Sequence, residues 1–79
     1  SSMEIRLEGH TEIFGKKKDQ YKLAQNRVKS VKRYLVEKGG IDPDRIKLKS
    51  YGGSRPVTLG EGDEERAKNR RVEIKILRK

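Results

Sequence analysis

A single helical stripe constrains the fold of this chain more than any other feature. Between residues 19 and 37 the apolar residues recur at spacings of 3, 4, 3 and 4, and they are Tyr21, Ala24, Val28, Val31 and Leu35. This spacing places their side chains on one face of an α-helix, which packs against another element. Gly39-Gly40 supplies the stop, because glycine readily adopts the positive φ at which many helices end. The sequence therefore predicts a helix over residues 19–37.

Runs of alternating residues lie before and after this helix. Apolar and charged side chains alternate in residues 3–10, and the same pattern returns in residues 46–51 and 72–77. A period of two predicts strands with one face on a core. Residues 63–68 favour a short helical turn, because their acids come first and their bases last. The order β-α-β-(short α)-β predicts a two-layer α+β domain whose first two strands are parallel, joined by a right-handed crossover.

Size and charge limit what such a domain does. With 79 residues, 30% of them hydrophobic, we expect one small domain over residues 1–79, with Ser1-Ser2 as an expression scar and no large cofactor site. No apolar stretch reaches the roughly 20 residues that span a membrane. The formal charge is +9, and the positive excess lies in residues 16–35, which carry +7, and in residues 69–79, which carry +4. That field would attract any polyanion.

The chain lacks the usual signatures of catalysis. Gly9 to Lys16 superficially resembles a phosphate loop, but too many residues separate its glycines and Lys17 stands where the loop needs Ser or Thr. The chain has one histidine and no cysteine, so we expect no metal site. His10 is expected to be a hydrogen-bonded residue at a strand end or in a loop. No nucleophile has a recognisable base at motif spacing, and we expect no enzyme.

Three motifs together resemble the OmpA-like peptidoglycan-binding domain, the module also found in Pal-type lipoproteins and MotB-type flagellar stator proteins. They are Gly9-His10-Thr11-Glu12 at the end of the first strand, Arg27 in the helix, and Asn69-Arg70-Arg71-Val72-Glu73 at the start of the last strand. The segment 51–57 also resembles the family's Gly-rich loop before Pro. The resemblance covers residues 3–78. It implies a three-stranded mixed sheet with residues 3–10 central and the last strand antiparallel beside them.

The family normally begins one strand and one helix earlier, so the resemblance implies a truncated OmpA-like fold. The absent strand would cover the outer edge of residues 70–78. We expect that edge to be open, to lower stability, and to offer a route to a homo-oligomer, since an open strand edge invites a partner. Lys75, Arg78 and Lys79 blunt the edge against aggregation.

The resemblance also implies a ligand site. In the family an acid after Gly-His-Thr and an Arg on the helix grip the diaminopimelate side chain of peptidoglycan stem peptides. Glu12 and Arg27 hold those positions, with Glu12 in place of the family's Asp, and Thr11, Leu23 and Arg71 complete the expected site. The free end of diaminopimelate carries an ammonium and a carboxylate, which suit one acidic and one guanidinium partner.

We therefore expect a non-catalytic module, without metal or cofactor, that binds peptidoglycan. It would anchor a membrane-associated parent protein in the periplasm, at the outer membrane or cell envelope. Two alternatives remain open, a minimised fragment that keeps only the fold and a basic nucleic-acid-binding module. Titration with a stem peptide distinguishes the peptidoglycan-binding module from the minimised fragment, and the salt dependence of any DNA binding tests the nucleic-acid-binding alternative. We expect no nucleic-acid partner.

Overall fold

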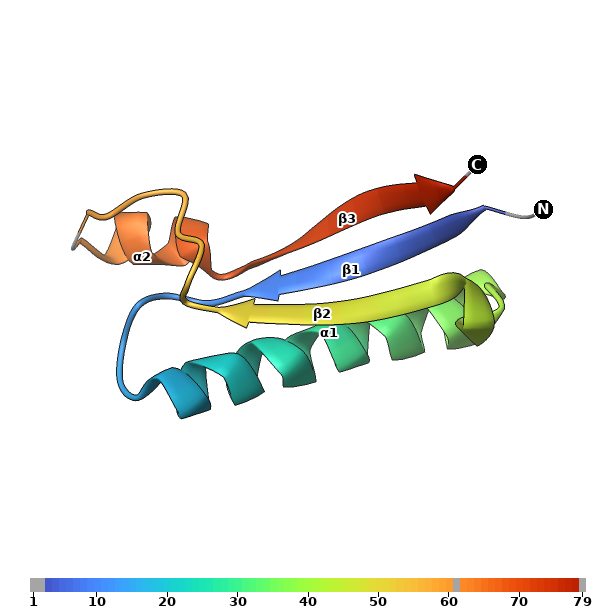
Figure 1. Cartoon of the computed structure of the whole chain (residues 1–79), viewed down its shortest axis with the longest axis horizontal. Helices are drawn as coiled ribbons and strands as arrows, with labels where there is room; N and C mark the ends of the chain where they lie inside the picture. Colours follow the sequence, from blue (N-terminus) through green and yellow to red (C-terminus); the bar gives the residue numbers. More distant parts are fainter. Residues whose placement is uncertain (1–2, 61, 79) are drawn as a thin grey trace.

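The computed structural model describes residues 3–60 and 62–78, and it places them in a three-stranded sheet with one long helix packed on it (Figure 1). Ser1 and Ser2, interpreted above as an expression scar, lie outside the described residues, as does Lys79. In chain order the elements are β1 (Glu4–His10), α1 (Lys17–Gly39), the 3₁₀ turn η1 (Pro43–Arg45), β2 (Ile46–Gly52), α2 (Asp63–Asn69) and β3 (Arg71–Arg78). The predicted α+β order of strands and helices is confirmed.

The sheet is mixed and β1 is its central strand. The strand order is β2-β1-β3, with β1 parallel to β2 and antiparallel to β3. In this register Leu7 lies beside Leu48 on one side and beside Ile74 on the other. Both the central position of residues 3–10 and the antiparallel last strand agree with what the family resemblance implied.

Helix α1 extends two residues further at each end than the predicted range 19–37. At its C-terminal end Gly40 has φ 66°, its N–H donates to the carbonyl of Val36 at 3.2 Å, and the N–H of Ile41 donates to the carbonyl of Leu35 at 3.3 Å. A residue with a Cβ is strained at this φ, so glycine is what lets the helix close its last turn. Helix α1 is not apolar enough to cross a membrane, and neither is any other helix among the described residues.

The core lies between α1 and the strands β1 and β2. Leu7, Val28 and Ile46 are buried at its centre, and Ala24 is fully buried beside them. Gly9 lets the helix approach this closely, because a Cβ there would lie 2.6 Å from the carbonyl oxygen of Ala24 and 2.7 Å from Cγ1 of Val28. The half-buried residues packed around this core are Ile5, Val31, Leu35, Val36, Ile41, Leu48 and Val72.

One residue of the predicted helical stripe lies outside this core. The side chain of Tyr21 is 50% exposed, and the buried residue in that turn is Gln20. The first turn of α1 packs on backbone, since Gly52 approaches the backbone of Tyr21 and the hydroxyl of Ser50 donates to its carbonyl at 2.8 Å. Close backbone contact leaves no room for a tyrosine ring, which therefore points away.

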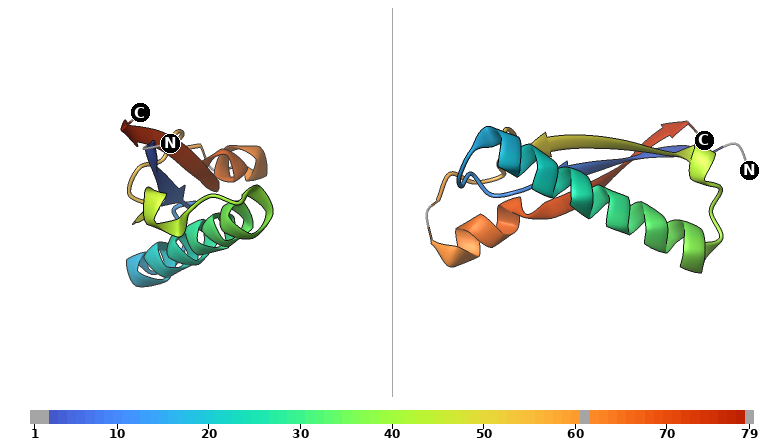
Figure 2. Two further views of the ribbon diagram at one scale, coloured as in Figure 1. Left: turned by 90° about the vertical axis from the view of Figure 1, so that its right-hand side faces the viewer. Right: turned by 90° about the horizontal axis from the view of Figure 1, so that it is seen from below.

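Strand β3 is less covered than its alternating sequence predicted. Its register with β1 puts Val72, Ile74 and Ile76 on the same side of the sheet as Leu7, the side that carries α1. Helix α1 packs against β2 and β1 (Figure 2), however, and Ile74 and Ile76 remain 59% and 56% exposed. The apolar face of the sheet thus extends beyond the helix that covers it.

Candidate functional site

The predicted site residues come from segments that meet at one end of the sheet. There β1 ends, the loop into α1 begins, and the loop after β2 and the start of β3 lie close by (Figure 1). The N–H of Thr11 donates to the carbonyl of Gly52 at 2.8 Å, which joins the loop after β1 to the end of β2. Side chains far apart in sequence are thereby held on rigid elements.

A small hollow at this end brings together three of the predicted residues. Its volume is about 100 Å³, and its lining is Thr11, Glu12, Phe14, Asp19, Gln20 and Leu23. Thr11 is buried, Glu12 is half-buried, and Leu23 is exposed at the rim. The hollow therefore offers one hydroxyl, one amide, two carboxylates and two apolar side chains, a lining suited to a cationic group on a short aliphatic chain.

Arg27 is not among the residues that line this hollow, but it lies one helical turn after Leu23, which does line it. Its Nη1 donates a hydrogen bond of 3.0 Å to the carbonyl oxygen of His10, the last residue of β1. That bond fixes a guanidinium two residues from Glu12 along the chain. Arg27 is only half-buried, so this planar cation remains open to an acidic ligand.

The structure does not bring the fifth predicted residue, Arg71, to Glu12. Its Nε donates to Glu73 at 2.6 Å and its Nη2 donates to the carbonyl of Arg55 at 3.1 Å, on the side of the sheet opposite α1. Its neighbour Arg70 takes that place instead, with Nη1 3.8 Å from Oε1 of Glu12. Adjacent residues at the start of a strand point to opposite sides, and this alternation was the signal that could have found Arg70.

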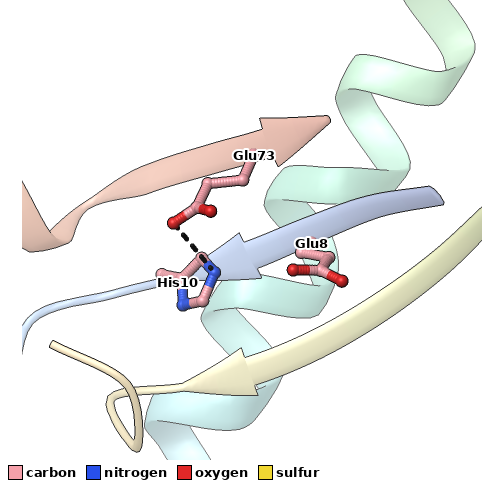
Figure 3. A group of neighbouring side chains, drawn as sticks. All are labelled: Glu8, His10 and Glu73. Carbon is pink, nitrogen blue, oxygen red and sulfur yellow. Dashed lines mark ion pairs between the residues drawn. The ribbon is translucent and has the colours of Figure 1, made fainter. Parts of the chain in front are cut away.

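His10 is the centre of a second cluster, on the helix-free side of the sheet (Figure 3). Its ring is 2% exposed and stacks on Tyr51 at 5.3 Å, while its Nε2 lies 3.7 Å from Oε2 of Glu73. It ends β1 as expected, but within the described part of the chain neither ring nitrogen has a hydrogen-bond partner. Burial, and then the nearby charge of Arg71, lower the pKa of His10 from its usual 6.5.

The same cluster contains Glu8, so that one histidine and two carboxylates offer ligand atoms within 4.8 Å of one another (Figure 3). Arg6 already holds Glu8 at 2.7 Å, and Lys75 holds Glu73 at 3.1 Å together with the Arg71 contact described above. Those hydrogen bonds lower the pKa of Glu73. A divalent cation would compete with these bases on a chain of formal charge +9. Their ion pairs lie within single strands, Arg6 with Glu8 on β1 and Arg71 and Lys75 with Glu73 on β3, and they hold the two carboxylates in place.

Asn69, the first residue of the Asn-Arg-Arg motif, has a structural role. Its buried Oδ1 accepts from the N–H groups of Val57 at 2.8 Å and Thr58 at 3.3 Å, and its Nδ2 donates to the carbonyl of Thr58 at 3.0 Å. A single amide thus satisfies backbone groups of the loop between β2 and α2. This anchors the loop beside the start of β3.

Comparison with known proteins agrees with this geometry. Residues 1–70 match the model of the OmpA family. The chain is 43% identical over 75 residues to the peptidoglycan-associated lipoprotein of Pseudomonas aeruginosa, covering 95% of this chain and 44% of that protein. It is 45% identical over 69 residues to the outer membrane protein A of Bordetella avium, covering 87% of this chain and 35% of that protein. The chain thus spans less than half the length of either relative.

Solved structures show the same arrangement of elements. The C-terminal domain of Helicobacter pylori MotB superposes with a TM-score of 0.86 and 32% identity, covering 98% of this chain and 59% of that one. The peptidoglycan-associated lipoprotein of Burkholderia pseudomallei superposes with a TM-score of 0.88 and 28% identity, covering 94% of this chain and 62% of that one.

Proposed function

The chain belongs to the OmpA family, and we propose that it is a non-catalytic module that binds peptidoglycan and anchors its parent protein to the cell wall. The names of its relatives support this: two are peptidoglycan-associated lipoproteins, and another is an outer membrane protein. A membrane-associated parent and a place in the periplasm, at the outer membrane or cell envelope, follow from the same proposal.

We place the ligand, the diaminopimelate side chain of a stem peptide, between Glu12 and Arg27. The observation that carries this choice is the hollow lined by Thr11, Glu12 and Leu23 with the Arg27 guanidinium beside it. Glu12 would take the ammonium, Arg27 the carboxylate, and Leu23 the aliphatic chain between them. Charge-assisted hydrogen bonds of this kind contribute about 1.5–3 kcal/mol each.

The two arginines of the last motif would support this site in different ways. Arg70 lies 3.8 Å from Glu12, and it would turn toward the ligand's carboxylate once the ammonium takes its place. Arg71 stands behind the site, because its bonds to Glu73 and to the carbonyl of Arg55 tie the start of β3 to the loop after β2. The site would thus use Thr11, Glu12, Leu23, Arg27 and Arg70, with Arg71 as their brace.

An NMR titration with two stem peptides tests the proposal. One peptide carries diaminopimelate, and its matched control carries lysine at the same position, which keeps the ammonium and lacks the carboxylate. We expect saturable shifts at Thr11, Glu12 and Arg27 with the first peptide and at least tenfold weaker binding of the second. Equal binding of both peptides would refute the Arg27 clamp. If neither peptide causes shifts, the chain does not bind this ligand, and the alternative of a minimised fragment that keeps only the fold is favoured.

A contact with a polyanion is the second candidate, and the exposed bases of α1 favour it. Lys22, Lys29 and Arg33 are exposed along the helix and are not among the residues that line the proposed hollow. Binding of this kind weakens steeply as salt increases and tolerates many polymers. Titration with a DNA duplex at 50 and 200 mM salt, alongside the stem peptide, separates the two candidates. Binding to DNA through many charges should weaken sharply as salt increases, whereas the diaminopimelate contact, which uses few charges, should change far less.

A further inference from the structure

A second hollow adjoins the one proposed for diaminopimelate, and Phe14 lines both. Its volume is about 290 Å³, and Arg66 of α2 is part of its lining, so we call it the Arg66 hollow. The loop after β1, the loop between β2 and α2, and α2 itself contribute to it, at the end of the sheet where these segments meet (Figure 1). Arg70, which follows α2, lies 3.8 Å from Glu12 of the diaminopimelate hollow. The two hollows therefore form one continuous surface.

Large apolar side chains stand exposed at the Arg66 hollow. Ile13, Phe14 and Leu59 line it and are 55%, 72% and 80% exposed. Binding pockets for small molecules are lined mainly by apolar side chains with a few polar groups that orient the ligand. Three such side chains beside a proposed ligand site are therefore suited to contact with small apolar groups of that ligand.

Arg66 adds an uncommitted cation to this apolar lining. Its side chain is exposed, and among the described residues its guanidinium has neither an acidic partner nor a hydrogen-bond acceptor. Lys68 in the same helix, by contrast, is paired with Glu65 at 3.2 Å. A guanidinium presents parallel N–H groups that match a carboxylate. The Arg66 hollow is thus complementary to a carboxylate at the end of a short apolar group.

We propose that the Arg66 hollow binds the carboxyl-terminal end of the stem peptide, the D-alanine that follows diaminopimelate. This inference rests on the proposed function, because the diaminopimelate side chain has to occupy its own hollow first. The methyl group of the alanine would lie against Phe14 and Leu59, and its free carboxylate would accept from Arg66. The chain would then recognise the stem peptide at two adjoining points.

The skeleton of diaminopimelate sets the reach between these points. Four carbon–carbon bonds of about 1.5 Å each join its free end to the peptide main chain. Each further residue adds at most about 3.3–3.6 Å. The alanine therefore ends only a short distance from the diaminopimelate hollow, where Phe14 is the side chain shared with the Arg66 hollow.

NMR titration of the chain with three synthetic stem peptides tests this assignment. The first peptide ends at diaminopimelate with its main-chain carboxyl amidated, the second adds D-alanine with a free carboxylate, and the third adds D-alanine amide. We expect the second to bind about fivefold tighter than the first, the effect of one exposed ion pair. The third should lose most of that gain. Only the alanine-containing peptides should shift Leu59, and the free carboxylate should shift Arg66 most.

Two variants separate Arg66 from the general charge of α2. Arg66→Gln should abolish the preference for the free carboxylate, whereas Lys68→Gln, which removes one charge from the same helix, should keep it. Equal binding of the second and third peptides, or a preference that survives Arg66→Gln, overturns the inference. Alanine-dependent shifts at Tyr21 and Tyr51, which line a different hollow, also overturn it.

The first peptide keeps this inference distinct from the proposed function. If that peptide shifts Thr11, Glu12 and Arg27 but the added alanine brings no gain, the diaminopimelate site stands and the Arg66 hollow has no part in it. If none of the three peptides binds, both the site and its extension are wrong. A gain from the free carboxylate that depends on Arg66 supports both.

Discussion

Replacing Arg27 by lysine separates the shape of its guanidinium from its charge. The structure fixes that guanidinium at the end of β1 through the bond from Nη1 to the carbonyl of His10. A lysine keeps the positive charge but loses the planar fork that meets a carboxylate with two parallel bonds. It also donates from a single atom, which cannot hold the His10 carbonyl and a ligand carboxylate in the same geometry.

The expected loss follows from these contacts. One charge-assisted hydrogen bond to the ligand is worth about 1.5–3 kcal/mol, so Arg27→Lys should weaken stem-peptide binding by about tenfold or more. The bond to the His10 carbonyl is worth about 0.5–1.5 kcal/mol in stability. Arg27 is half-buried and lies off the Ala24 and Val28 face of α1, so the fold should persist.

Lys29→Ala is the matched control, because Lys29 is exposed on the same helix and its loss removes one full charge. Binding is measured by NMR titration with the diaminopimelate stem peptide, and stability by urea unfolding of each variant. If Lys29→Ala weakens binding as much as Arg27→Lys does, affinity comes from the general field of the helix. The reasoning that assigns a clamp to Arg27 would then be wrong.

Three further changes have expected outcomes. Glu12→Asp should tighten stem-peptide binding in the same titration, because it restores the shorter reach of the family's aspartate; weaker binding would argue against Glu12 as the acid. Gly9→Ala should lower the free energy of unfolding in urea by about 1–3 kcal/mol or more, because its Cβ would overlap Ala24 and Val28; an unchanged midpoint would contradict that packing. Because the pKa of His10 is lowered in the folded chain, the unfolded chain takes up a proton at His10 at a higher pH than the folded chain does. The stability that depends on neutral His10 should therefore be fully present above pH 6.5 and be lost as the pH falls below it. His10→Phe, which keeps a ring on Tyr51, should reduce this loss of stability at low pH. If both proteins lose stability with the same pH dependence, a group other than His10 is responsible.

Local pattern was sufficient to predict the elements of this fold. The alternation in residues 3–10 and the helical stripe each report which side of an element meets the core, and β1 and α1 follow them closely. Pattern cannot report whether the facing layer is present. Ile74 and Ile76 alternate as a buried strand does, yet α1 packs against β1 and β2 and leaves them exposed. Whether a strand is covered depends on how the helix packs on the sheet, and the sequence of the strand alone does not show this.

The site was only partly predictable for a similar reason. Glu12 and Arg27 could be named from motifs, and the structure places both at the same end of the sheet. The partner of Glu12 depends on which of two adjacent arginines turns toward it, and the start of β3 decides in favour of Arg70. The cluster around His10 depends on the register that sets Glu8 beside Glu73. Such pairings become visible only once the strands are aligned.

In the site that we propose, the two arginines Arg70 and Arg27 would determine what kind of ligand fits at Glu12. With Arg70 3.8 Å away and Arg27 held beside the same hollow, a simple cation would have to displace Arg70 and would meet net repulsion. A simple anion would be attracted to the arginines but would meet the carboxylate of Glu12. In the site that we propose, a zwitterionic end would avoid both costs, because its ammonium would replace Arg70 at Glu12 while its carboxylate would accept from the released arginine and from Arg27. Binding would then be an exchange of ion pairs, so selectivity for a group bearing both charges would exceed what its affinity alone suggests.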